Sequence, residues 1–253
     1  MQLPDVKRLD AIRNQIEPIS KLISKWLLRK TAITAVRRVA PLRASIATDI
    51  GAVRKENQDR AAIMQFIDNK GSTISVLAVA DGIGGMSNGA SCAALAIGSL
   101  FGAIVNAARS EASPTHEWLC TAAHVANREV FKNFEGRGGT TLVALLLHDT
   151  EPPYWLSVGD SRVYRLSNNQ VLRESTDDTI AGQLGNKEAV DIEQTRLLQF
   201  VGMGTEIEPH VRALSSDEAS SVILTTDGVH YIENGSPIFS RLIVNSDDVG
   251  ICA

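Results

Sequence analysis

The sequence predicts an α+β fold in which helices and β-sheets pack in layers. Short β-rich segments begin near Ala44, two long helical stretches follow at about 88–108 and 115–134, and further short strands come after them. Hydrophobic residues make up 44% of the 253-residue chain and charged residues 21%, which is ordinary for a globular protein. A chain of this length can bury a sizeable core.

Residues 5–38 are expected to form a helix, because apolar side chains recur at three- and four-residue spacing. These side chains are Ile12, Ile16, Ile19, Leu22, Ile23, Trp26 and Leu27. Pro18 should break or kink this helix. The helix is either an arm packed on its own domain or a basic amphipathic element that docks on a partner or a membrane surface. We favour the first interpretation, since many Lys and Arg side chains simply solvate an exposed face.

Eight segments have the apolar and β-branched character of strands. They are 45–50, 60–66, 73–79, 141–147, 154–158, 162–166, 170–174 and 222–226. Residues 76–80 are almost entirely apolar, so this strand should lie centrally with both of its faces covered. Residues 167–169 are expected to form a hairpin turn, and the pattern over 176–210 is less regular.

The net charge of −4 is too small to favour nucleic acid or a membrane as a partner. The charge is uneven, however, because residues 1–43 carry +7 and the remainder carries −11. A basic segment often docks on something anionic, and an acidic body often marks metal sites or cationic partners. We therefore divide the chain into a basic helical N-terminal extension, 1–43, and a main domain, 44–253.

The sequence predicts a cytoplasmic protein. Residues 1–10 are polar and charged, unlike a signal peptide, and no apolar run approaches the ~20 residues needed to span a bilayer. The three cysteines, Cys92, Cys120 and Cys252, have no zinc or redox spacing, so reduced thiols are expected.

Two aspartates follow buried strands in the same way. Asp81 comes after the strand at 76–80 and Asp227 after the strand at 222–226, and a glycine follows each of them. A carboxylate at a strand end is held by a stiff scaffold, and glycine lets the backbone carbonyl approach a ligand closely. Oxygen ligands of this kind suit hard divalent cations such as Mg²⁺ and Mn²⁺. One such Asp-Gly pair would be read as a turn, but two at buried strand ends favour a metal site.

Two further polar segments could contribute to this site. In the segment 51–60, Asp59 could support metals and Arg54 could clamp a phosphate with its planar donor fork, although a solvated hairpin loop is the simpler reading. In the segment 158–162, Asp160 either binds metal or pairs with Arg162, and the residues alone leave both readings open.

Five motifs, in this order, resemble the metal-dependent Ser/Thr phosphatases of the type 2C (PPM) family in their bacterial form. They are Arg54 with Asn57-Gln58-Asp59, then Asp81-Gly82-Ile83-Gly84-Gly85, Gly139-Thr140-Thr141-Leu142, Gly159-Asp160-Ser161-Arg162 and Thr225-Thr226-Asp227-Gly228. The resemblance runs from about residue 45 to residue 235, and the ordered set is highly specific.

The resemblance implies a four-layer αββα sandwich, with two packed antiparallel β-sheets flanked by helices. It also implies a centre of two Mn²⁺ or Mg²⁺ ions and a weaker third ion. Asp81 would bridge the two metals, the Gly82 carbonyl would ligate one of them, and Asp227 would ligate the other. Asp160 matches a ligand of the third ion.

The resemblance also assigns the residues around the metals. Asp59 would lie just outside the direct ligands, and Arg54 would hold the substrate phosphate. Thr176 and Asp178 resemble part of the family's flap beside the active site. The implied chemistry is in-line attack on phosphorus by a metal-bridged hydroxide, with no covalent phosphoenzyme.

Three residues depart from the family pattern inside the motifs. Gln58 stands where many members have Glu, and its amide can still hydrogen-bond water. Ile83 replaces a His of eukaryotic members, so no general acid is available there. Tyr231 stands where a third-metal Asp is common, which puts a well-formed third site in doubt.

The largest departure is at the C-terminus, where the family has a final metal-ligating Asp-Asn pair and a last strand. The late candidate is Asp247, followed by Asp248. Either Asp247 is the last ligand of a shortened domain, or the chain lacks that ligand together with the last helix and strand. We lean slightly to the second reading, which would weaken metal binding and leave a sheet edge open.

The leading functional hypothesis is a Ser/Thr phosphoprotein phosphatase that acts on a phosphorylated protein and opposes a cognate Ser/Thr kinase. Arg54, Asp59 and Asp81 are its expected catalytic residues. The first alternative is a catalytically impaired phosphatase-like module that binds a phosphoprotein or regulator, because the C-terminal ligand is in question. The second is an interaction protein that acts through its basic arm.

Overall fold

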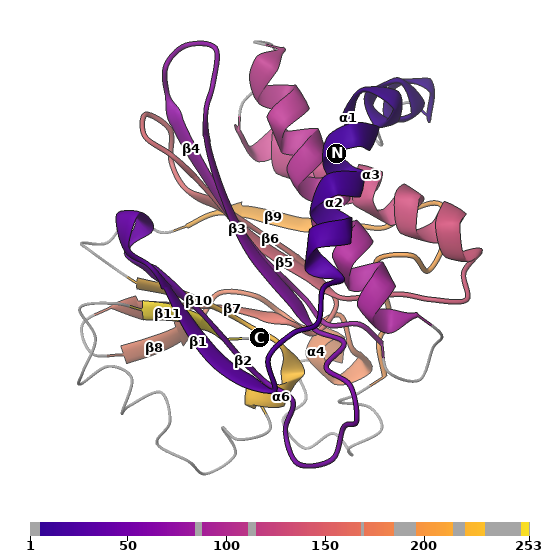
Figure 1. The fold of residues 1–253 in the computed structure, drawn as a ribbon, viewed down its shortest axis with the longest axis vertical. Helices are drawn as coiled ribbons and strands as arrows, with labels where there is room; N and C mark the ends of the chain where they lie inside the picture. The colour runs from indigo at the N-terminus through magenta and orange to yellow at the C-terminus, as the bar shows by residue number, and fades with distance from the viewer. Residues whose placement is uncertain are drawn as a thin grey trace.

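The structure is a computed structural model that describes residues 6–83, 88–110, 115–167, 170–184, 196–214, 221–230 and 249–252. Helices α2 (Gly89–Arg109) and α3 (Thr115–Phe134) cover one face of a five-stranded sheet, and α1 (Val6–Leu27) packs on the outside of α2 (Figure 1). The sheet has the order β3-β4-β5-β6-β9, and all neighbouring strands in it are antiparallel. Its strands are β3 (Arg60–Ile67), β4 (Thr73–Ala80), β5 (Leu142–His148), β6 (Tyr154–Val158) and β9 (His210–Ala213).

A second strand layer packs on the other face and consists of two three-stranded sheets, β1-β2-β11 and β10-β7-β8. The strands are β1 (Thr34–Val39), β2 (Ala44–Asp49), β7 (Arg162–Ser167), β8 (Gln170–Arg173), β10 (Ser221–Thr225) and β11 (Val249–Cys252). Strand β11 contacts β10 and so brings the two sheets side by side. The predicted α+β fold is therefore confirmed, with one difference: β11 runs parallel to β2.

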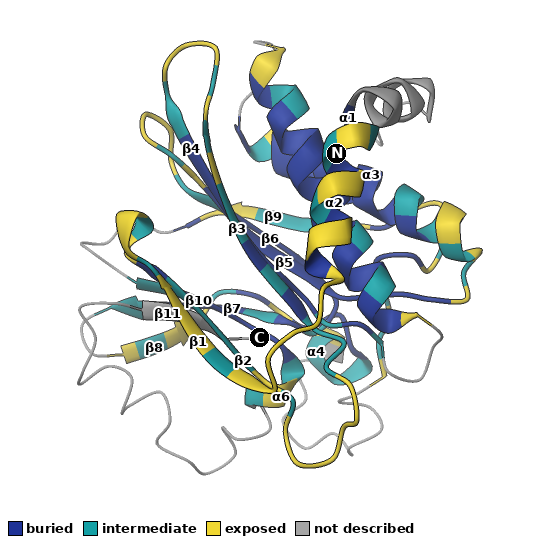
Figure 2. Ribbon diagram, viewed as in Figure 1, coloured by how far each residue is buried: buried dark blue, intermediate teal, exposed yellow. Residues whose placement is uncertain are grey.

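The core lies on both faces of the five-stranded sheet. Along β4, Val76 and Ala78 belong to the apolar cluster on the helical side, whereas Leu77 and Val79 belong to the cluster beneath the second layer. Successive side chains of a strand point to opposite faces, so an unbroken apolar run is what a doubly covered strand requires. The predicted central position of residues 76–80 is confirmed (Figure 2).

Helix α2 is packed inside the protein and is rich in small residues. An added Cβ at Gly98 would lie 2.7 Å from the Ser20 carbonyl oxygen, so glycine is what allows α1 to approach. Of the described helices, α2 alone is long and apolar enough to cross a membrane, although no apolar run of that length was expected from the sequence. Because 78% of the most apolar 18-residue stretch of α2 is buried, α2 fits the description of a core helix.

The N-terminal segment differs from the prediction. The helix continues through Pro18 but ends at Leu27, and residues 34–39 form strand β1 rather than the last turns of a helix. The β-branched residues Thr34, Val36 and Val39 favour a strand there, and pairing with β2 outweighs the helical spacing. Helix α1 packs on α2, as expected for an arm that lies on its own domain.

The C-terminal segment also differs from the reading that we favoured. Residues 249–252 form β11, which pairs with β2 from Val249↔Ala44 to Cys252↔Ala47, so a strand does follow Asp247. Three other short helices occur among the described residues: a 3-10 helix, η1 (Ala40–Leu42), and the α-helices α4 (Ile180–Leu184) and α6 (Asp227–His230). Residues 231–248, which include Asp247 and Tyr231, lie outside the described part of the chain.

Candidate active site

Asp81 is fixed at the end of β4 by the start of β5. Its backbone N–H donates to Thr141 Oγ1 at 3.0 Å, and its carbonyl accepts from Thr141 N–H at 2.9 Å and from Thr140 Oγ1 at 2.7 Å. The Thr141 hydroxyl lies 2.6 Å from that of Ser161, in the turn between β6 and β7. Hydrogen bonds on both sides of the Asp81 peptide therefore fix the direction of its side chain.

Gly82 lies in a crowded position behind Asp81. An added Cβ there would collide with the backbone of Gly89 at the start of α2 and would lie 2.9 Å from the Gln58 carbonyl oxygen. An added Cβ at Gly89 would in turn lie 2.7 Å from Gln58 Oε1. Gly82 was expected from the sequence to allow the close approach of a ligand. In the structure, glycine at this position also allows the segments around Gln58, Gly82 and Gly89 to pack closely.

Asp59 is held by a braced loop between β2 and β3. Its N–H donates to Asn57 Oδ1 at 2.9 Å, and Asn57 Nδ2 donates to Thr48 Oγ1 on β2 at 2.8 Å. The buried guanidinium of Arg60 donates to the carbonyls of Asn57 and Asp59 at 2.9 and 2.6 Å. Residues 57–60 of this loop therefore form a braced support for Asp59, whereas residues 51–56 are exposed to solvent.

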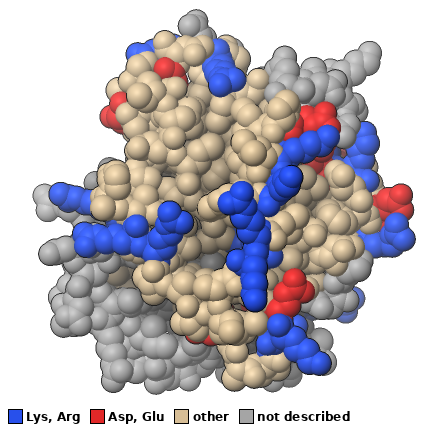
Figure 3. Space-filling view, in the orientation of Figure 1, with Lys and Arg blue, Asp and Glu red and all other residues tan. Residues whose placement is uncertain are grey.

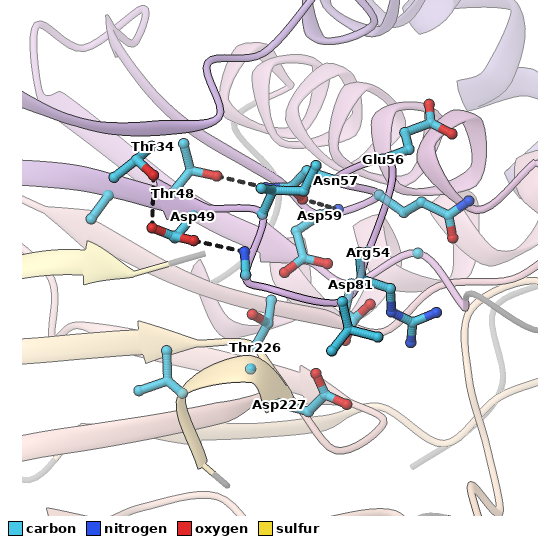
Figure 4. Close-up of a pocket in the computed structure, with 18 of the residues that line it drawn as sticks. Thr34, Thr48, Asp49, Arg54, Glu56, Asn57, Asp59, Asp81, Thr226 and Asp227 are labelled. Atoms are coloured by element: carbon cyan, nitrogen blue, oxygen red, sulfur yellow. Dashed lines mark hydrogen bonds between the residues drawn. The ribbon is translucent and has the colours of Figure 1, made fainter. Parts of the chain in front are cut away.

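Asp227 approaches from the second layer, directly after β10. Figure 4 shows its carboxyl group facing those of Asp59 and Asp81 across one pocket. Thr226 hydrogen-bonds to Asp59 and so links the end of β10 to the β2–β3 loop. The two Asp-Gly strand ends thus meet in space, as the sequence predicts.

Two of these carboxyl groups, Asp81 and Asp59, have raised pKa values in the folded protein. Burial raises the pKa of Asp81 to about 10, and the negative charges of Asp59 and Asp227 add to the shift. Burial also raises the pKa of Asp59, against the opposing effect of its hydrogen bond from Thr226. Both shifts arise because negative charge is confined without enough positive charge nearby.

A hard divalent cation would supply the missing positive charge. The donors present are carboxylate and carbonyl oxygens, which are the ligands that Mg²⁺ and Mn²⁺ prefer. Across the described residues, however, no group of three or more His, Cys, Asp or Glu side chains is already arranged to hold a metal ion. The chemistry of Asp59, Asp81 and Asp227 therefore fits a metal, while a closed ligand shell is not preformed by these side chains.

Asp160 lines the same pocket from the turn between β6 and β7. Burial, followed by the charges of Asp227 and Asp177, raises its pKa to about 7. Arg162 Nη2 donates to Asp177 at 2.8 Å, and the positive charge of Arg162 acts against the rise in the pKa of Asp160. The turn needs Gly159, whose φ of +98° lies in the region that glycine adopts readily.

Asp178 connects this turn to Gln199 and His210. Its carboxylate accepts from Gly159 N–H and from Gln199 Nε2, each at 2.8 Å, and His210 Nε2 lies 2.8 Å away. The sequence analysis noted Asp178 only through its family resemblance. Its observed contacts give it a positioning role for the loop that carries Asp160.

The pocket has a volume of about 870 Å³, and Thr34, Ala35 and Val36 of β1 form part of its lining. Arg54 lines it and is exposed on the β2–β3 loop, where its guanidinium lies beside Asp81 in Figure 4. Ile83, which takes the place of a family His, lines the same pocket. The structure thus brings together Arg54, Asp59, Asp81, Gly82, Asp160 and Asp227.

Sequence reasoning missed the residues that hold the aspartates in place. Asn57, Thr141 and Thr226 were read as parts of motifs without a role, and Arg60 was not singled out. Asn57, Arg60 and Thr226 are polar residues within two positions of a predicted site residue, which was the available signal. Thr141 and Thr226 contact aspartates that are distant in sequence, so spacing alone could not identify these contacts.

The fold and the site together define the class: an α+β protein with a carboxylate-lined pocket at strand ends from both strand layers. The family profile of protein phosphatase 2C matches residues 52–247, so the chain belongs to that family. The predicted resemblance is thereby confirmed.

Relatives and solved structures agree with this family. Protein phosphatase PhpP of Streptococcus pneumoniae is 28% identical over 214 residues, covering 80% of this chain and 84% of the relative. Serine/threonine phosphatase stp of Listeria welshimeri is 26% identical over 202 residues, covering 74% and 78%. The solved serine/threonine phosphatase of S. agalactiae superposes with a TM-score of 0.64 at 20% identity, covering 79% and 85%, and supports the fold.

Proposed function

We propose that this chain hydrolyses phosphoserine and phosphothreonine in proteins with the help of two Mn²⁺ or Mg²⁺ ions. The observation that carries the proposal is the meeting of Asp59, Asp81 and Asp227 at one pocket, where the pKa of Asp81 is raised to about 10. Family membership and relatives named as Ser/Thr phosphatases support the same activity.

In this proposal, Asp81, the Gly82 carbonyl and Asp227 hold the two ions, and Asp160 takes part in a weaker third site. The ions, when bound, lower the pKa of a coordinated water and neutralise charge on the phosphate. Asp59 orients the groups around the ions from the braced β2–β3 loop. Arg54 binds the substrate phosphate with its donor fork, in reach of solvent and of a protein-sized substrate. Asp247 remains a proposed ligand outside the described residues.

The proposed substrate is a phosphoprotein, and the proposed biological role is to oppose a Ser/Thr kinase in the cytoplasm. The exposed position of Arg54 at the pocket mouth supports a large substrate, because a side chain on the surface of a protein need not enter a deep cavity.

The test is Mn²⁺-dependent hydrolysis of p-nitrophenyl phosphate and of a phosphothreonine peptide. Asp81→Asn is expected to lower kcat/KM by about a thousandfold or more, because a central carboxylate is lost. The melting temperature of the metal-free protein should not fall. The folded protein disfavours ionisation of Asp81, as its raised pKa shows, and asparagine does not ionise.

The matched control is Asp149→Asn, the same chemical change beyond the opposite end of β5 on the surface. It should leave turnover within about twofold of the parent. A parent protein that binds the phosphopeptide but shows no Mn²⁺-stimulated turnover would contradict the proposal and indicate a phosphatase-like binding module.

A further inference from the structure

Strand β1 forms an edge of the second strand layer. Among the described strands it pairs with β2 alone, and most of its residues are exposed (Figure 2). An exposed edge presents backbone donors and acceptors to which another extended chain can add. The described part of the protein therefore contains a strand edge available for pairing on its surface.

The register shows which backbone groups of β1 face this open edge. The Ile50 N–H donates to the Ile33 carbonyl at 2.9 Å, and the register continues with Thr34↔Asp49 and Ala35↔Thr48. Hydrogen-bonded and non-hydrogen-bonded pairs alternate in an antiparallel ladder. Consequently, the N–H and C=O groups of Val36, like those of Thr34, point away from β2.

This edge is continuous with the proposed catalytic pocket. Thr34, Ala35 and Val36 line the same cavity as Asp81 and Asp227. An extended segment that pairs along β1 would therefore pass the mouth of the pocket. A phosphorylated side chain of that segment could then reach the pocket without any rearrangement of β1.

The charge around β1 favours an acidic partner. From the end of α1 to Asp49 the sequence has no Asp or Glu and five cations, namely Arg29, Lys30, Arg37, Arg38 and Arg43, of which Arg37 and Arg38 lie on β1 itself. Figure 3 shows Lys and Arg outnumbering Asp and Glu on the face that carries β1. Apolar Val36 and Val53 are 75% and 90% exposed beside the same pocket.

We infer that the open edge of β1 binds an acidic, extended segment of the phosphoprotein substrate as an added β-strand. This inference rests on the proposed phosphatase function and names how the substrate docks. A strand edge that continues into the pocket favours a peptide over an anionic bilayer. A bilayer could interact with the basic side chains, but it could not form the hydrogen bonds that the backbone N–H and C=O groups of β1 offer.

The sharpest test changes the backbone of β1 at Val36. Val36→Pro removes the N–H that faces the open edge and leaves the β1–β2 hydrogen bonds intact, because that N–H takes no part in them. The matched control Val36→Ala shortens the side chain and keeps the N–H. The measurement is the ratio of kcat/KM for a phosphothreonine peptide flanked by glutamates to kcat/KM for p-nitrophenyl phosphate.

Val36→Pro is expected to lower this ratio about three- to tenfold, the effect of losing one backbone hydrogen bond, and Val36→Ala should lower it less than about twofold. An unchanged ratio in Val36→Pro, or an equal fall in both variants, overturns the inference. Because p-nitrophenyl phosphate has no peptide backbone, its turnover by the parent protein tests the phosphatase function separately. If the parent does not turn it over, fluorescence anisotropy of the labelled peptide with the same variants tests the docking.

A second variant, Arg37→Glu, leaves the backbone of β1 unchanged and tests the charge. It should reduce the preference for the glutamate-flanked peptide over a glutamine-flanked peptide about threefold or more at low salt, and less at high salt. An unchanged preference overturns the inference. Binding to phosphatidylserine vesicles that Arg37→Glu abolishes, while the peptide preference stays the same, would also overturn it and assign the basic face to a membrane surface.

Discussion

The two strand layers of this protein are packed very differently, although both contribute to one pocket. In the five-stranded sheet, β4 and β5 are buried along nearly their whole length between the helices and the second layer. In the second layer, β1 and β8 are mostly exposed, and β2 is only partly covered. We call these the covered layer and the open layer.

The difference indicates a division of labour at the site. Asp81 stands on the covered layer, where hydrogen bonds from Thr140 and Thr141 fix its backbone. Asp227 and the edge strand β1 belong to the open layer, which faces the solvent from which a substrate arrives. Rigid elements hold a catalytic constellation most accurately, whereas exposed elements are available to a partner.

The sharpest comparison of the two layers uses one leucine from each. Leu146 on β5 is completely buried, and Leu172 on β8 is 38% exposed. Leu146→Ala should lower the free energy of unfolding by about 2–5 kcal/mol, because it removes apolar contacts and leaves a cavity. Leu172→Ala should cost less than about 1 kcal/mol. Urea denaturation of both variants measures the difference, and equal losses would show that the open layer is packed as tightly as the covered one.

Helix α1 extends the covered layer outward, and its contact with α2 is the next test. An added methyl group at Gly98 would meet the side chain of Ser24 and the backbone of Ser20. Gly98→Ala should therefore destabilise the protein by about 1–3 kcal/mol, despite the better helix propensity of alanine.

The control for this prediction is Gly204→Ala, because an added Cβ at Gly204 meets nothing within 4 Å. It should change the free energy of unfolding by less than about 0.5 kcal/mol. Thermal and urea unfolding compare the two variants. A Gly98→Ala protein that is as stable as the Gly204→Ala protein would mean that α1 contributes little to the covered layer.

The covered layer was largely predictable from sequence, and so were β2, β7, β8 and β10 of the open layer, whereas β1 and β11 were not. The apolar run at 76–80 and the helical periods at 88–108 and 115–134 are strong local signals, and the structure confirms them within one or two residues. Strands β1 and β11 lie at the two edges of the sheet β1-β2-β11. Their structure depends on pairing with β2, a long-range contact that a sequence pattern does not contain.

The residues of the site also divide into those that the sequence reveals and those that only the structure reveals. Asp81 and Asp227 were recognisable because each follows a buried strand and precedes glycine, and their meeting in space is confirmed by the structure. Asn57 and Asp178 act through partners on other elements, Thr48 for Asn57 and Gly159 for Asp178, so only the folded structure reveals these contacts. The metal-binding roles themselves stay predictions, and so does the role of Asp247.

The smallest effect on the free energy of unfolding is expected from a substitution of His210, which contacts Asp178 where the two layers meet. The imidazole of His210, at the start of β9, lies 2.8 Å from Asp178, which also accepts the Gly159 N–H. This hydrogen bond raises the pKa of His210, against the effects of burial and of Arg212, while Glu208 raises it slightly further. A raised pKa means that the folded state binds the proton more tightly than the unfolded chain does.

The pH dependence of His210→Gln follows from this shift. The stabilisation by protonated His210 is fully present below its unfolded pKa of about 6.5 and is lost as the pH rises through the higher pKa of the folded state. His210→Gln should therefore cost up to about 1 kcal/mol near pH 5.5 and much less near pH 8.5, since the partly exposed pair is screened by solvent. Urea unfolding of parent and variant across this range measures the effect. A difference that stays constant, or grows toward high pH, would show that His210 supports the junction between the layers by packing and not by its charge.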